Sequence, residues 1–163
     1  MRICVASLFL TFSFVSQSQL LIKQDVFKTE MKDMFLQANK GFPSEEIACS
    51  TADGVMIKRD GEAPVLQLKY NCFSSDEAVK TKEMLASMVT EILPPGDYSA
   101  NKGYGAAYFD YLKWLFEFDS TDFAEKKKRP SIEIGALQNG DQYTVMIYVR
   151  SPHFIGQYTP RWD

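Results

Sequence analysis

The sequence predicts an α+β fold in which two helices pack on one face of an antiparallel sheet, in the order α-β-β-α-β-β-β. Apolar residues recur at helical spacing in two segments, whereas elsewhere they alternate with polar residues at the period of a strand. Asp60-Gly61 and Asn139-Gly140 are turn signals of β-hairpins. Placing both helices on one face buries the apolar side of the sheet and of each helix together.

The chain opens with the layout of a secretory signal peptide over residues 1–18. Arg2 precedes the apolar run Ile3–Val15, which is too short to span a bilayer as a helix. Ser16 and Ser18 then occupy the two small-residue positions required before a cleavage site.

Cleavage is therefore expected before Gln19, leaving residues 19–163 as a single globular α+β domain that is secreted or periplasmic. A lipid anchor on Cys4 is disfavoured because this residue precedes the end of the apolar run. No second long apolar segment follows, so we expect no membrane span.

The charge balance excludes a general attraction to nucleic acid. The formal net charge is −3, and it becomes −4 when residues 1–18, which contain Arg2 and no acidic residue, are removed. The expected partner is therefore an unknown protein, glycan or small ligand. The sequence indicates no oligomeric state, cofactor or metal.

Residues 23–39 form the first expected helix, and Gly41 is its expected left-handed stop. Polar side chains occupy the opposite side of this segment. Its apolar face consists of Phe27, Met31, Met34, Phe35 and Ala38.

Residues 46–73 are interpreted as a hairpin with its turn at Asp60-Gly61. In that register Val55 faces Leu66. Cys49 would also face Cys72, and two cysteines in an oxidising compartment predict a disulfide. A metal site on these cysteines is disfavoured, because zinc needs further ligands. Asp53-Gly54 is a competing turn or bulge signal within the first strand.

The second expected helix begins at a capping box, in which Ser74 is the N-cap and Glu77 lies three residues later. Pro94-Pro95 ends it. Its apolar face consists of Ala78, Leu85, Met88, Val89 and Ile92. Residues 96–105 are interpreted as a loop.

Residues 104–119 contain the densest aromatic run of the chain. Trp114, Phe116 and Phe118 alternate with other residues at the period of a strand. A helix is the alternative, with Asp110, Lys113 and Glu117 as its polar stripe. We favour a central strand because aromatic residues suit pleated surfaces.

The last two strands form a hairpin around Asn139-Gly140, after an expected loop at residues 120–129. In the expected register Ile134 faces Val145 and Ile132 faces Ile147. The apolar positions of the two strands then share one continuous face. Residues 151–163 form a tail that carries two prolines.

Catalytic motifs are scarce in this sequence. There is no P-loop, no H-E-x-x-H, no G-x-S-x-G and no EF-hand loop. Ser99 and Lys102 have the S-x-x-K spacing of penicillin-recognising enzymes, but the companion motifs are missing. The basic block 126–129 is interpreted as a solvated loop, although it could bind a phosphate, a sulfate or a headgroup.

Tyrosines provide the only positive indication of a function. Tyr98, Tyr104, Tyr108 and Tyr111 lie close together in the chain, and tyrosine combines apolar area with a polar tip. We therefore predict an exported, non-catalytic binding or interaction module that uses these four residues.

The alternative is a small enzyme with a cavity between sheet and helices. It would use His153, the only histidine, or Asp110 as an acid or base. A surface or packing role is the simpler interpretation of His153, which lies in the tail between Pro152 and Phe154.

Overall fold

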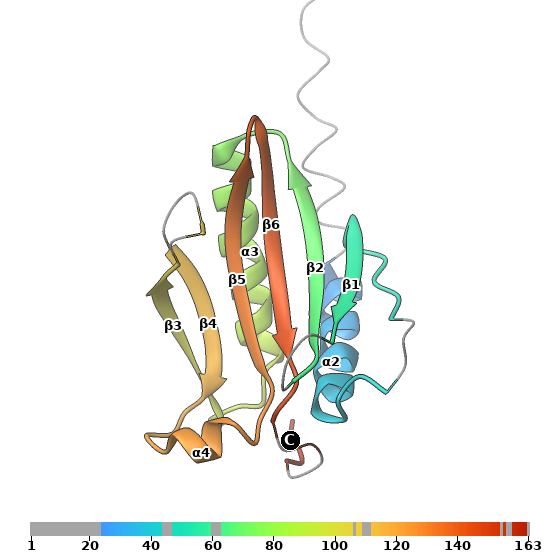
Figure 1. The fold of residues 1–163 in the computed structure, drawn as a ribbon, viewed down its shortest axis with the longest axis vertical. Helices are drawn as coiled ribbons and strands as arrows, with labels where there is room; N and C mark the ends of the chain where they lie inside the picture. Colours follow the sequence, from blue (N-terminus) through green and yellow to red (C-terminus); the bar gives the residue numbers. More distant parts are fainter. Residues whose placement is uncertain are drawn as a thin grey trace, which may run out of the picture.

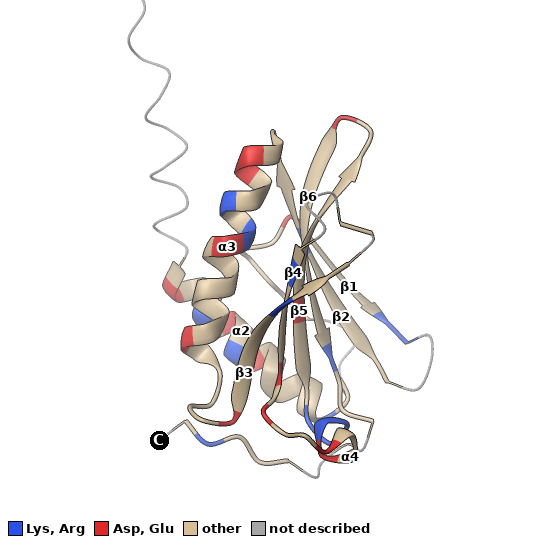
Figure 2. Ribbon diagram, turned by 90° about the vertical axis from the view of Figure 1, so that its left-hand side faces the viewer, with Lys and Arg blue, Asp and Glu red and all other residues tan. Residues whose placement is uncertain are grey.

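Six antiparallel strands form one sheet, and the two long helices cover one of its faces (Figures 1 and 2). The computed structural model of the chain describes residues 24–43, 47–59, 63–105, 107–108, 112–153, 155 and 158–162. The signal peptide expected at residues 1–18 lies outside the described residues. In the described part, no helix is long and apolar enough to cross a membrane.

The element order is α-β-β-α-β-β-α-β-β, and the predicted α+β class is confirmed. The elements are α2 (Gln24–Asn39), β1 (Gly54–Lys58), β2 (Val65–Cys72), α3 (Ser75–Ile92), β3 (Tyr98–Tyr104), β4 (Leu112–Phe118), α4 (Phe123–Lys126), β5 (Ser131–Asn139) and β6 (Gln142–Arg150). The strand order across the sheet is β1-β2-β6-β5-β4-β3. The two differences from the expected order are the strand β3 and the short helix α4.

The helix termini follow the sequence signals. Ser74 caps α3 by accepting a hydrogen bond from the Glu77 amide at 3.2 Å, and Glu77 in return accepts one from the Phe73 amide at 2.7 Å. Gly41, just after α2, has a φ of 75°, which confirms the expected left-handed stop. Both helices turn the expected apolar faces toward the sheet.

The register of the first hairpin differs from the predicted one by two residues. Val55 faces Leu68, and the last pair is Lys58 with Val65. The connection therefore spans residues 59–64 in place of a two-residue turn, although Asp60 and Gly61 lie outside the described residues. A shift by two keeps every side chain on its expected face, because side chains alternate with a period of two.

The same shift removes the geometric basis of the predicted disulfide. Both Cys49 and Cys72 are free thiols. Cys49 precedes β1, and its Sγ lies 3.4 Å from a carboxylate oxygen of Glu30 in α2. Cys72 ends β2 opposite Tyr143 of β6. In the observed register the position across from Cys49 would be residue 74, which already caps α3, so the predicted bond was wrong.

The register of the second hairpin also differs from the predicted one by two residues. Asn139 pairs with Gln142, and the turn is Gly140-Asp141, with Gly140 at a φ of 61°. Ile134 therefore faces Ile147, whereas Val145 was expected. The expected apolar face is nevertheless the buried one. Its fully buried members are Ile132, Ile134, Ala136, Val145, Ile147 and Val149.

The aromatic segment forms a strand as predicted, but a shorter and less central one. Its strand β4 lies second from the edge, because residues 98–104, expected to be a loop, form the edge strand β3. Trp114 and Phe116 point to the helix side, and Phe116 is 1% exposed.

Candidate functional site

The four predicted binding tyrosines occupy different environments. Tyr104 ends β3 and is 86% exposed. Tyr98 begins β3, is half-buried and donates a hydrogen bond to the Pro130 carbonyl at 2.9 Å. Tyr108 is buried, and Tyr111 lies outside the described residues. Tyr98 and Tyr104 therefore lie at opposite ends of β3, and Tyr108 packs elsewhere, so the structure does not gather the described tyrosines into one site.

Tyr108 lies on the open face, the side of the sheet that carries Lys113, Glu133, Gly135 and Arg150 and is turned away from α2 and α3 (Figure 2). Its ring covers Gly135, where a Cβ would overlap ring carbons. Its hydroxyl donates a hydrogen bond to Glu133. Burial, reinforced by this hydrogen bond, raises the pKa of the Tyr108 phenol. Tyr108 thus anchors its loop to the sheet.

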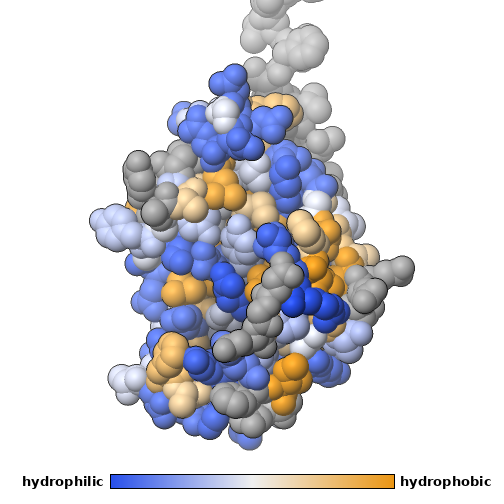
Figure 3. Space-filling model, viewed as in Figure 1, coloured by the Kyte–Doolittle hydropathy of each residue, from blue (hydrophilic) through white to orange (hydrophobic). Residues whose placement is uncertain are grey.

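Glu133 is the centre of the charge network on the open face. Its side chain is only 12% exposed. Lys113 donates to it at 2.9 Å, and the Arg150 guanidinium lies 3.8 Å away. Figure 3, which views this face, shows hydrophobic residues as separate patches among hydrophilic ones.

Strand β3 is an uncovered edge of the sheet in the described part of the chain. The Asp119 amide donates to the Asp97 carbonyl at 2.9 Å, at the end of the β3–β4 ladder. In an antiparallel pair, residues bonded to the partner strand alternate with residues whose N–H and C=O point away. Counting from Asp97, the outward-pointing residues are Tyr98, Ala100, Lys102 and Tyr104.

A small apolar pocket of about 240 Å³ lies beside Ala100 on the helix side of this edge. Thr90, Leu93 and Pro94, from the end of α3 and the residues after it, form one side. Tyr98 and Phe116 complete it with Ala100. At Ala100, therefore, the backbone N–H and C=O point away from the sheet, and a pocket that could hold a side chain lies beside them.

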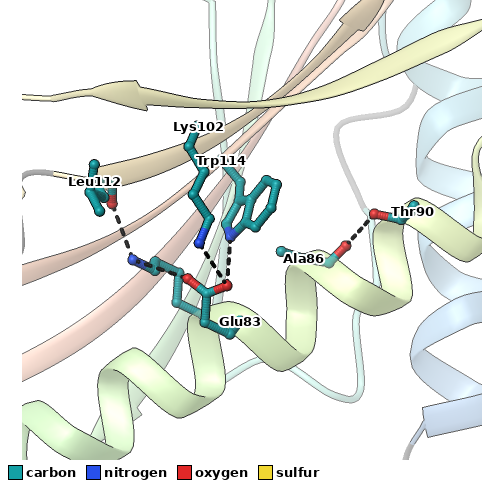
Figure 4. Close-up of polar contacts among 7 residues, drawn as sticks. Glu83, Ala86, Thr90, Lys102, Leu112 and Trp114 are labelled. Carbon is teal, nitrogen blue, oxygen red and sulfur yellow. Dashed lines mark hydrogen bonds and ion pairs between the residues drawn. The ribbon is translucent and has the colours of Figure 1, made fainter.

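A polar cluster ties the edge strand to α3 (Figure 4). Glu83 accepts a hydrogen bond from the Trp114 indole at 3.1 Å and lies 3.5 Å from the Lys102 ammonium. That ammonium also lies 4.6 Å from the centre of the Trp114 ring. These contacts hold the β3–β4 hairpin against α3. They also direct the Lys102 side chain of the edge strand toward the helix.

Sequence reasoning missed Lys82, which is 2% exposed on the inner face of α3. Its ammonium donates to the Leu112 carbonyl at 3.3 Å and lies 3.6 Å from Glu83. The signal was present in the spacing, because residue 82 falls between Ala78 and Leu85 on the stripe that faces the core.

The cavity that the enzyme alternative requires exists, with a volume of about 270 Å³ between α2, α3 and β2. Tyr70 lines it, and its buried hydroxyl has no hydrogen-bond partner among the described residues. His153 does not line this cavity; it is exposed beside α4. Asp110 lies outside the described residues. His153, one of the two alternatives for acid–base chemistry, is thus not part of this cavity.

Comparison with protein-family models, with curated proteins and with solved structures gave no match.

Proposed function

We propose that the protein is a small binding module that adds an extended segment of a partner protein to its sheet at β3. The observation that carries the proposal is the apolar pocket beside Ala100, at the residue whose backbone faces the open edge. Strand addition of this kind draws affinity from main-chain hydrogen bonds and specificity from pockets for alternate side chains.

The edge lacks most of the features that protect natural sheets from such pairing. Strand β3 has seven residues and no proline, and four of its residues are exposed. Its one charged residue, Lys102, is held toward Glu83 and Trp114. Tyr104, at the end of the strand, provides an exposed ring beside the path of an added strand.

The chemistry of the pocket indicates what the partner segment carries. An apolar side chain of the added strand would enter between Leu93 and Phe116, across from Ala100. The flanking backbone groups at Tyr98 and Lys102 would pair with the segment on either side. The proposed partner is therefore an extended peptide with an apolar residue at its centre.

A displayed library of random twelve-residue peptides tests this proposal. Ala100→Pro removes an outward N–H without removing a β3–β4 hydrogen bond, and proline is tolerated on edge strands. Ala100→Leu keeps the N–H and fills the pocket. We expect peptides selected on the wild type to lose about tenfold or more in affinity for both variants, and Ala100→Ser to bind within about twofold of wild type.

Two results would refute strand addition at β3. One is a library that yields no peptide preferring wild type over Ala100→Pro. The other is a set of peptides that bind Ala100→Pro as tightly as wild type, while circular dichroism shows both proteins folded.

We further propose that the module is exported, with residues 1–18 as the leader. The support is the arrangement of Arg2, the apolar run and the two small residues before Gln19. Mass spectrometry of the N-terminus of protein recovered outside the cytoplasm should find Gln19 first. An uncleaved chain would contradict the proposal.

A further inference from the structure

A third pocket, of about 440 Å³, lies on the open face at the end of the sheet beside α4. The strand register builds its floor, because Arg150 of β6 pairs with Val65 of β2 on one side and with Ser131 of β5 on the other. Helix α4 and the residues after it contribute Lys126, Lys127 and Arg129, among others. The volume is that of a small-ligand site.

The lining is strongly basic, although the whole chain carries a net charge of −3. Four cationic side chains line the pocket against one carboxylate, Glu117. Lys126 pairs with Glu117 at 3.2 Å. Lys127 has its ammonium 4.9 Å from the centre of the Phe123 ring, and no carboxylate lies within ion-pair distance of it in the described part of the chain.

Arg129 is held in place before any ligand arrives. Its guanidinium lies 3.6 Å from the ring centre of Phe118 and 4.2 Å from that of Tyr158. Asp97 lies 3.6 Å from it on a third side. A cation fixed in this way loses little conformational entropy when an anion binds nearby.

Ser151 provides an independent indication of a ligand. It lines the same pocket and is 4% exposed, and its Oγ has no hydrogen-bond partner among the described residues. Buried hydroxyls are nearly always paired, so an unpaired one calls for an explanation. An oxygen of a bound anion would accept its proton.

We propose that this pocket binds a small organic molecule that carries a tetrahedral oxyanion, a phosphate or sulfate group. The charged group would lie near Lys127, Arg150 and Ser151. Phe118 and Phe123, the latter 70% exposed, form apolar walls for the body of the molecule. This site is separate from the β3 edge.

Phenyl phosphate, phenyl sulfate, inorganic phosphate and phenol are the probes, titrated into the protein and followed by amide NMR shifts. We expect saturable shifts at Lys127, Ser131 and Ser151 with phenyl phosphate or phenyl sulfate, weaker binding of inorganic phosphate, and none of phenol. The two esters distinguish phosphate from sulfate as the preferred group. Added salt should weaken binding, because the contact is ionic.

The charge variants form a matched pair. Lys127→Gln should weaken binding of the preferred ester about tenfold, as expected for a lost charge-assisted hydrogen bond. Lys128→Gln removes the same charge one residue away, but Lys128 pairs with Glu125 at 2.5 Å and does not line the pocket, so about twofold or less is expected. Ser151→Ala should weaken binding without lowering the melting temperature.

The proposal is overturned if neither ester saturates the shifts, if phenol binds as well as the esters, or if the two lysine variants weaken binding equally. Equal weakening would mean that the basic residues attract the anion only through their summed charge, without direct contacts in the pocket. Ala100→Pro should leave this binding unchanged, so failure here and failure of the β3 proposal are distinguishable.

Discussion

Lys82 and Ser151 show two outcomes for a polar side chain in the interior. The Lys82 ammonium reaches the Leu112 carbonyl and Glu83, so its burial between α3 and β4 is compensated by hydrogen bonding and charge. The Ser151 hydroxyl reaches no partner among the described residues. A buried hydroxyl without a partner lowers the stability of the folded state, because water solvates it in the unfolded chain.

We therefore predict that Ser151→Ala stabilises the ligand-free protein by about 1 kcal/mol. The alanine side chain occupies nearly the same space. The substitution removes no hydrogen bond, because the Ser151 hydroxyl makes none with the described residues. Urea denaturation of the two proteins measures the difference. Destabilisation by the alanine would show that the hydroxyl has a structural partner and would weaken the case for a ligand contact.

Tyr108, in the described part of the connection between β3 and β4, packs on the open face. Tyr108 lies over Gly135 of β5, and its hydroxyl reaches Glu133 two residues earlier on the same strand. A Cβ at Gly135 would overlap the ring. The glycine is therefore required by the close approach of Tyr108 and not by its own backbone conformation, which any residue adopts.

We expect Gly135→Ala to destabilise the protein by about 1–3 kcal/mol, as overpacking does. In the Tyr108→Ala background the same substitution should cost close to nothing, because the ring that it overlaps is gone. A double-mutant cycle in urea measures this coupling. Equal costs in both backgrounds would mean that the ring does not rest on Gly135 in solution.

Tyr108 and Tyr158 are buried, and Tyr70 and Tyr98 are half-buried. Burial raises the pKa of Tyr70, Tyr98, Tyr108 and Tyr158 above the ordinary phenol value of about 10. Below about pH 10 these phenols are neutral in both the folded and the unfolded chain, so they give stability no pH dependence there.

Above about pH 10 the unfolded chain releases phenol protons that the folded chain retains. Stability must then fall as pH rises, because the unfolded state binds fewer protons than the folded state. The free thiols of Cys49 and Cys72 act in the same direction at lower pH, because burial raises the pKa of both above the ordinary thiol value of about 8.5. We predict that the urea midpoint begins to fall above about pH 8.5 and falls more steeply above about pH 10, where the tyrosines add to the effect. Tyrosinate absorbance should rise together with loss of the helical circular dichroism signal. Ionisation of these tyrosines in a protein that stays folded would contradict the prediction.

The sequence by itself determined which residues form most of the elements and which side of each is buried. Helical and strand periods are local properties, so Phe27 and Met31 in α2, and Ile132 and Val149 in the last hairpin, lie on the faces that their spacing predicts. The Ser74–Glu77 cap and the stop at Gly41 are equally local.

Tertiary structure alone decided the registers and the places of the polar groups. The register of each hairpin differs from the predicted one by two residues. The alternation of apolar and polar residues cannot reveal such a shift, because every side chain stays on the same face. That shift separated Cys49 from the position of Cys72. Pairing with β4 made residues 98–104 a strand, which left Tyr104 exposed, whereas packing against Gly135 buried Tyr108. Contacts between distant segments decide such outcomes, and local patterns carry no information about them.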